Sequence, residues 1–208
     1  MRKKYELTDK TKTLADGTVL RRIRAVRDFT LAGGMEVREG DLGGWIEKED
    51  NLSHCCEAWI FGNANVFGDA WVSGSAKVSG DANVYGNAWI TCSTEVFGDA
   101  VVCGAAIIGG EAKVFGSAKV SGKADICGSA QVKNVNDYAT YKNTWSSGRW
   151  FTYTRSNKMW RVGCFYGTGK ELIAKAYRDS KLSGQCYKAV VRVQETIDKA
   201  IEKAQRTK

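Results

Sequence analysis

The sequence contains little of what enzyme and metal sites are usually made of. Its single histidine is His54, and its seven cysteines include no CxxC spacing, which argues against a zinc site and against a disulfide framework. No apolar run reaches the length of a membrane-spanning helix, and the first ten residues, MRKKYELTDK, carry cations without an apolar stretch behind them. We therefore expect a soluble, cytoplasmic protein that binds no metal and needs no cofactor.

Positive charge is unevenly distributed along the chain. The formal net charge of +8 arises from 31 Lys and Arg against 23 acids. Residues 136–208 hold 15 of the basic residues and 6 of the acids, whereas residues 55–135 hold 5 and 7. A basic C-terminal segment favours an anionic partner such as a nucleotide, a nucleic acid or an acidic protein face. The alternative is a solvated helical surface that is rich in lysine.

A six-residue repeat runs through the middle of the chain. From Ile60 to Val132 every sixth residue is Ile or Val, and Ala stands two positions before each of them except at Thr94. Gly stands two positions after each of them except at Cys92 and Asn134. Ala and Val two apart point to the same side of a strand, and Gly permits the bend that follows. Each hexad is therefore expected to form one short strand and one corner, and the stacked hexads a parallel solenoid.

The repeat resembles that of the hexapeptide-repeat left-handed β-helices, in which three hexads form one triangular coil. One departure is that Gly follows the aliphatic residue after one intervening position, where the family usually places it immediately. The resemblance implies a mainly β fold with a solenoid over residues 55–135 and, as is common in the family, a homotrimer. Residues 1–54 are expected to form an N-terminal β cap, and residues 136–208 a small basic α+β domain.

Three hexads per coil would place residues eighteen apart in one column on the outside of the solenoid. One column holds Trp71, Trp89 and Ile107, which we expect to form a subunit interface because such an apolar row is unlikely to stay in water. The alternative is that the ends of the chain cover this face. The other two faces carry aromatic columns as well, formed by Phe67 with Tyr85, and by Phe61, Phe97 and Phe115.

The C-terminal segment predicts a β-hairpin followed by two helices. Residues 149–155 and 159–165 alternate as two strands around a tight connection at residues 156–158. Thr168 and Glu171 form a capping box at the start of the first helix. The second helix carries an apolar stripe, expected to be a packing or oligomer seam, formed by Val190, Val193, Ile197 and Ile201.

The hairpin is the expected ligand site. Alternation would turn Trp150, Trp160 and Val162 toward the core and leave a face of arginines and aromatics outside, suited to stacking on bases and to phosphate contacts. The residues expected to bind an anionic ligand are Arg149, Phe151, Tyr153, Arg155, Arg161, Phe165 and Lys170. The alternative is cation–π packing of the same rings beneath the two helices.

His54 supports one catalytic alternative. Hexapeptide-repeat acyltransferases generally use a histidine base near the coils, and His54 with Glu57 would imitate that pairing. Cys55 and Cys56 are weak nucleophile candidates that only His54 would activate. The repeat, however, contains no long loop insertion that would shape a cleft. The sequence therefore predicts that the protein is not an enzyme, with an acyltransferase as the alternative.

Outside the repeat the chain is similar to small bacteriophage and prophage proteins of the hexapeptide-repeat or polymer-forming kind. The matching stretches are KYELTDKTKTL, LRRIRAVRDF, GDLGGWIEKEDNLS and NTWSSGRWFTYTRSNKMWRVGCFYGTGKEL. This resemblance offers no catalytic residues. It implies a phage accessory protein in the host cytoplasm that counters host defence, by binding a nucleotide signal, a nucleic-acid-containing complex or a host defence protein. A structural protein of the phage particle is a further alternative.

Overall fold

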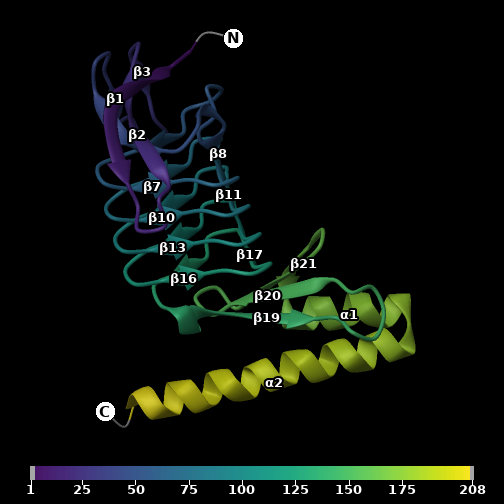
Figure 1. Ribbon diagram of the computed structural model, residues 1–208. Coiled ribbons are helices and arrows are strands. Elements are labelled where there is room, and N and C mark those ends of the chain that lie inside the picture. Colours follow the sequence, from purple (N-terminus) through teal and green to yellow (C-terminus); the bar gives the residue numbers. More distant parts are fainter. Residues whose placement is uncertain (1–2, 207–208) are drawn as a thin grey trace. The chain divides into compact units, whose positions relative to one another are not determined.

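The computed structural model describes residues 3–206 and divides the chain into two compact units, Met1–Asp137 and Tyr138–Lys208. The first unit is a β-solenoid with N-terminal strands, and the second is a small α+β unit (Figure 1). The expected fold class, a mainly β hexapeptide-repeat solenoid followed by a part with two helices, is confirmed. Each unit is considered separately below.

The N-terminal part of the first unit is built from five strands and a short 3-10 helix at Glu49–Asn51. The strands are β1 (Tyr5–Thr13), β2 (Val19–Ala25), β3 (Phe29–Thr30), β4 (Glu36–Val37) and β5 (Leu42–Ile46). β1, β2 and β5 pair antiparallel, and β5 then pairs parallel with the first strand of one solenoid face. A bridge from Leu52 to Val72 extends a second face in the same way. The parallel stacking therefore already begins in the segment expected to be only a cap.

The solenoid has three faces of two-residue strands. Face 1 contains β7 (Asn65–Val66), β10 (Asn83–Val84), β13 (Val101–Val102) and β16 (Lys119–Val120). Face 2 contains β8 (Trp71–Val72), β11 (Trp89–Ile90), β14 (Ile107–Ile108) and β17 (Asp125–Ile126). Face 3 contains β6 (Trp59–Ile60), β9 (Lys77–Val78), β12 (Glu95–Val96), β15 (Lys113–Val114) and β18 (Gln131–Val132). The strands of one face form a column along the solenoid (Figure 1).

Two features of the hexad hold the coils together. The Ala and the Val or Ile of each hexad point inward and are at most 1% exposed, so that they fill the interior. Thr94, which replaces one Ala, is also buried and donates its hydroxyl hydrogen to the Thr91 carbonyl oxygen at 2.6 Å. Backbone N–H groups of each coil donate to carbonyls of the next coil, as from Asn83 to Ala100 and from Tyr85 to Val102, at 2.9 and 3.0 Å. The repeat thus satisfies backbone polarity and apolar burial together.

The second unit is a four-stranded antiparallel sheet with two helices on one face. A short 3-10 helix at Val135–Asp137 precedes it, and the sheet is ordered β19 (Tyr138–Lys142), β20 (Trp150–Thr154), β21 (Met159–Val162) and β22 (Phe165–Thr168). The helices are α1 (Gly169–Asp179) and α2 (Lys181–Arg206). The predicted capping box is confirmed, because Thr168 and Glu171 bond to each other's backbone N–H at the start of α1.

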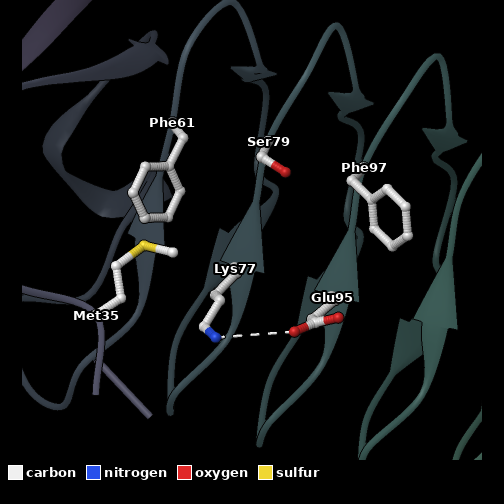
Figure 2. A pocket seen from close by; sticks show the side chains of 6 residues that line it. All are labelled: Met35, Phe61, Lys77, Ser79, Glu95 and Phe97. Carbon is white, nitrogen blue, oxygen red and sulfur yellow. Dashed lines mark ion pairs between the residues drawn. The ribbon is translucent and has the colours of Figure 1, made fainter. Parts of the chain in front are cut away.

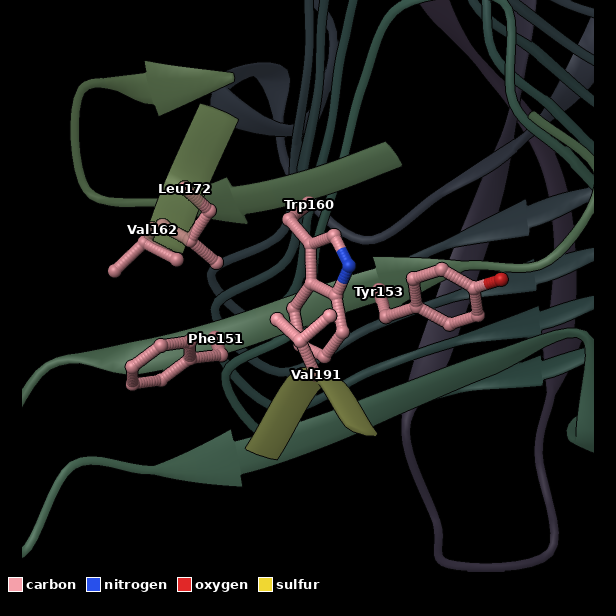
Figure 3. Packing of buried hydrophobic residues seen from close by; sticks show 6 residues of the cluster. All are labelled: Phe151, Tyr153, Trp160, Val162, Leu172 and Val191. Atoms are coloured by element: carbon pink, nitrogen blue, oxygen red, sulfur yellow. The ribbon is translucent and has the colours of Figure 1, made fainter. Parts of the chain in front are cut away.

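The predicted orientation of the first hairpin strand is wrong, whereas Trp160 and Val162 of the second strand face the core as predicted. Phe151 and Tyr153 are 0% and 4% exposed and pack with Trp160 and Val162 beneath the helices (Figure 3). Phe151 pairs with Val162 and Tyr153 with Trp160, because β20 ends at Thr154 and the connection has four residues instead of three. A shift of one residue moves every side chain of a strand to the other face.

Glycine at the solenoid corners allows a direct test of the coil spacing. Gly80 and Gly122 have φ values of +71° and +70°, but a Cβ on Gly80 would lie 2.8 Å from the Gly98 nitrogen, whereas a Cβ on Gly122 meets nothing within 4 Å. We expect Gly122→Ala to lower the free energy of unfolding by about 1 kcal/mol through backbone strain alone. Gly80→Ala should lose about 1–3 kcal/mol more, because it forces two coils apart.

The measurement is urea denaturation of the two variants and of the wild-type protein under the same conditions. Gly122→Ala is the matched control, since Gly122 has the same left-handed backbone but no following coil within reach of a Cβ. Equal losses in the two variants would contradict the conclusion that close approach of the coils requires glycine at these corners.

Candidate functional site

A groove lies on face 3 of the solenoid. It has a volume of about 340 Å³ and is lined by Met35, Phe61, Lys77, Ser79, Glu95 and Phe97. Strands β6, β9 and β12 and the turns that follow them supply five of these residues, and Met35 comes from the loop between β3 and β4. Phe61, Ser79 and Phe97 lie in one row across three successive coils, and Met35, Lys77 and Glu95 lie in a second row beside it (Figure 2).

The second row is a ladder of alternating charge. Glu95 Oε2 lies 2.8 Å from Lys113 Nζ, and Glu95 Oε1 lies 3.7 Å from Lys77 Nζ. The hydrogen bond from Lys113 lowers the pKa of the Glu95 carboxyl group, so this side chain is a carboxylate at neutral pH. Lys77 is the more loosely held of the two lysines, and its side chain is 22% exposed at the floor of the groove. The groove therefore combines a row of two rings and a serine with a partly exposed lysine side chain.

A second group of polar residues surrounds His54, and we call Lys4, Tyr5, Glu49 and His54 the N-terminal cluster. The His54 ring stacks on Tyr5 with centroids 4.2 Å apart. Its Nδ1 accepts the Lys4 backbone N–H at 3.3 Å, and its Nε2 lies 3.8 Å from Glu49 Oε2. The carboxylate that faces His54 is thus that of Glu49. The prediction that Glu57 would be the partner of His54 is wrong. Burial lowers the pKa of His54, so the imidazole is neutral at pH 7.

Lys4 belongs to this candidate site, although the sequence did not indicate it. Its side chain is 0% exposed, and its ammonium group donates to the carbonyl oxygens of Cys56 and Ala58 at 3.2 and 2.7 Å. Burial lowers the pKa of Lys4 to about 8. Strongly shifted pKa values gather at functional sites, so the cluster is a candidate for chemistry as well as for packing. One lysine among several near the N-terminus gives no signal of this in the sequence.

The groove and the N-terminal cluster lie at the same end of face 3. Tyr5, on which the His54 ring stacks, also contacts Trp59, with ring centroids 6.3 Å apart. Trp59 belongs to β6 and pairs in register with Lys77 of β9, which lines the groove. The chain from His54 through Tyr5 and Trp59 to Lys77 connects the two sites within the first unit.

The residues expected to bind an anion in the second unit are not brought together as one surface. Phe151 and Tyr153 lie in the core, as reported above. Arg155 pairs with Asp198 of α2 at 3.0 Å, and Asp198 also accepts the Tyr153 hydroxyl hydrogen. Phe165 packs under Lys175 of α1. The packing alternative thus describes these rings better than a stacking surface does.

Three cations of the expected anion-binding residues do not lie in the core of the second unit. Arg149 and Lys170 are exposed, and Arg161 is half-buried on the sheet. Nothing in the arrangement of these three side chains identifies a ligand, so their role in binding a nucleotide or nucleic acid stays a prediction.

The predicted aromatic columns are confirmed. Trp71, Trp89 and Ile107 pair in register on face 2 and are 39%, 50% and 39% exposed. Phe67 stacks on Tyr85 of face 1, and Phe97 on Phe115 of face 3. The role of the Trp column as a subunit interface, and the homotrimer itself, stay predictions.

The buried Lys4 predicts how stability depends on pH. Its pKa falls from an ordinary value near 10.5 to about 8, so between these values the unfolded chain holds a proton that the folded chain lacks. The free energy of unfolding should therefore rise with pH from about pH 8 toward pH 10, by about 2 kcal/mol from this group. The raised pKa of Tyr5 acts in the opposite direction above pH 10, which sets the upper limit of the window.

Urea denaturation between pH 7.5 and pH 10 measures this contribution. Lys4→Met should remove the rise while lowering stability at every pH, because two carbonyl oxygens lose their donor. Lys10→Met, which changes an exposed lysine on β1, should keep the rise. A rise that persists in Lys4→Met would contradict the assignment of this proton to Lys4.

Comparison with known proteins gives one relative with a named activity. No family model matches the chain. The chain is 35% identical over 83 residues to a protein of Escherichia coli (strain K12) described as "Uncharacterized acetyltransferase YdcK". The match covers 36% of this chain and 24% of the relative, so the chain spans about a quarter of the length of that protein.

This similarity changes the expected function. The expectation that the protein is not an enzyme is contradicted, because the named relative is an acetyltransferase. The acyltransferase alternative is therefore supported better than the main prediction. Neither the fold nor the comparison supports a phage origin, a counter-defence role or binding of a nucleotide signal. Neither helix within residues 3–206 has the length and hydropathy of a membrane-spanning segment. Solenoid and similarity together fit the hexapeptide-repeat β-helix family.

Proposed function

We propose that the protein is an acyltransferase, which moves an acetyl or similar acyl group from a thioester to an amine or hydroxyl acceptor. The observation that carries the proposal is the similarity to the E. coli acetyltransferase, together with the hexapeptide-repeat solenoid. In this reaction the acceptor nitrogen or oxygen attacks the thioester carbonyl carbon, and the carbon–sulfur bond breaks. The acceptor proton passes to a base, and the thiol leaves after taking up a proton.

His54 is the histidine available as the base, since the sequence contains no other. Its lowered pKa keeps the ring unprotonated at neutral pH, as a base requires. Because Nδ1 accepts the Lys4 N–H, the neutral ring carries its own proton on Nε2, toward Glu49. The hydrogen bond from the Lys4 backbone N–H to Nδ1 is long at 3.3 Å. In the reaction Nδ1 would give up this hydrogen bond and take the proton of the acceptor group. The Glu49 carboxylate would then stabilise the imidazolium ion.

Turnover of acyl-CoA thioesters tests the proposal. A panel of donors and of amine and hydroxyl acceptors is assayed by release of free thiol, and we expect turnover with at least one pair. His54→Ala should lower kcat/KM by about a hundredfold or more, and Glu49→Gln should lower it less. Glu57→Gln is the matched control and should leave it unchanged, because the exposed Glu57 does not contact the imidazole.

The pH profile gives an independent readout of the same residue. A base must be unprotonated, so kcat/KM should fall as pH drops through the pKa of His54, which lies below its ordinary value of 6.5. Full activity of His54→Ala would refute the role of His54 alone. The absence of turnover across the whole panel, with protein shown to be folded by its unfolding transition, would refute the acyltransferase.

We also propose, as the sequence suggests, that face 2 is the subunit interface of a homotrimer. The column of Trp71, Trp89 and Ile107 is apolar and exposed, which favours burial against another copy. Native mass spectrometry should show a trimer for the wild type and a monomer for the double variant Trp71→Ser, Trp89→Ser. The matched control is Phe67→Ser, Tyr85→Ser on face 1, which should remain a trimer. A monomeric wild type, or a trimeric Trp double variant, would contradict the proposal.

A further inference from the structure

In the position that follows the inward Val or Ile, two pairs of rings on successive coils stack face to face. The Trp71–Trp89 pair, which stands before the inward residue, meets edge to face instead. Phe67 and Tyr85 on face 1 have ring centroids 5.0 Å apart and an angle of 10° between planes. Phe97 and Phe115 on face 3 have nearly the same geometry, with 5.1 Å and 8°. Both centroid distances follow from the spacing of strands within a sheet, which is about 4.8 Å. Where two successive coils both carry a ring in this position, the rings therefore stack as rungs of a ladder at a fixed spacing.

The ladder on face 3 lacks one rung, and the gap is the groove. Its column reads Phe61, Ser79, Phe97 and Phe115, so that Ser79 is the one residue among these four without a ring. Figure 2 shows Ser79 between Phe61 and Phe97 in the same row. Two coil spacings separate these rings by roughly 10 Å, about twice the distance between neighbouring rungs. One planar ring would fit between them at the spacing that the other rungs show.

The chain itself does not fill this gap. Met35 is the residue from outside the solenoid that lines the groove, and it is 51% exposed. Figure 2 shows the Met35 thioether beside the Phe61 ring, where sulfur packs well at aromatic edges, but the residue remains half exposed. The groove volume of about 340 Å³ is large enough for a small ligand. The missing rung is therefore open to a ligand with an apolar, flat body.

The polar side of the groove indicates what such a ring would carry. The Ser79 hydroxyl group stands at the position of the missing rung. Lys77 lies beside it and is loosely paired, at 3.7 Å from Glu95, whereas Lys113 holds the same carboxylate at 2.8 Å. Because Glu95 keeps its closer partner, Lys77 can turn toward a ligand at little cost. An acceptor or negative group on the ring would find an ammonium group and a hydroxyl group within the groove.

We propose that the groove binds a planar aromatic ring bearing a carboxylate or another acceptor group, and that this ring completes the ladder between Phe61 and Phe97. The proposal deepens the proposed function, because it names the chemical class of ligand that the enzyme takes on face 3. It rests on ring geometry and not on turnover. A binding measurement can therefore fail while acyl transfer is found, and the reverse.

Binding of 2-naphthoate to the full-length protein is the first test, with decahydro-2-naphthoate as the saturated analogue. Isothermal titration calorimetry or ligand-observed NMR gives the two dissociation constants. The flat ring should bind about tenfold more tightly, as expected from the added energy of aromatic pairs. Ser79→Phe should abolish binding, since it supplies the missing rung from the chain itself. That variant should fold, because Phe occupies the equivalent position in three neighbouring hexads of the same column.

Two further variants localise the site. Cys103→Phe extends the aromatic column on face 1, which does not line the groove, and should leave the affinity unchanged. Lys77→Met should weaken 2-naphthoate about threefold and leave the neutral probe 2-naphthalenemethanol unaffected.

The proposal would be overturned by equal binding of the flat and the saturated acid, which would show a general apolar groove. Binding that survives Ser79→Phe in a folded protein would overturn it as well, because the ligand would then lie elsewhere. No binding of either acid by the wild type has the same consequence.

Discussion

The hydrogen bonds between successive coils set the constraint on which the rest of the first unit depends. Each coil donates backbone N–H groups to the next, and the interior beneath them is filled by Ala and by Val or Ile that are almost fully buried. Both requirements hold only if neighbouring coils keep the spacing of paired strands, about 4.8 Å. Left-handed glycine corners such as Gly80 allow this approach, since a Cβ there would meet the backbone of the next coil. The solenoid is therefore rigid, and outward side chains on successive coils have the same regular spacing as the strands.

On such a surface, a residue acts through its column more than through its neighbours in sequence. Lys77, Glu95 and Lys113 form an ion-pair ladder because they stand eighteen residues apart, and the stacked rings arise for the same reason. A pair of stacked rings, such as Phe97 and Phe115, leaves no space for a ligand between them. A departure from the column leaves a defined space, as Ser79 does within its row of rings. Chemistry on this scaffold is therefore most readily found at the exceptions to the repeat.

The repetitive part of the fold could be predicted from the sequence because its information is local and redundant. Thirteen copies of one hexad indicate the strands, the corners and the columns, and a local pair, Thr168 and Glu171, indicates the start of α1. The second unit lacks this redundancy. One residue more in the β20–β21 connection reversed the predicted faces of β20, whereas Trp160 and Val162 of β21 face the core as predicted. In α2 the buried face includes Gln194 and Asp198, which bond to Tyr141 and Tyr153, while Val193 and Ile197 are exposed.

The candidate site follows the same division between repetitive and irregular chain. His54 contacts Lys4 and Tyr5, which lie about fifty residues away in the sequence, and its Nε2 faces Glu49. No periodic pattern in the sequence predicts these contacts. Met35 reaches the groove from an irregular loop. The solenoid supplies exact spacing but few groups that titrate near neutral pH, whereas the N-terminal segment supplies a neutral imidazole and a lysine of lowered pKa. The proposed acyl transfer would need both parts of the chain. The rigid solenoid surface would position the substrate, and the N-terminal segment would supply the groups that react with it.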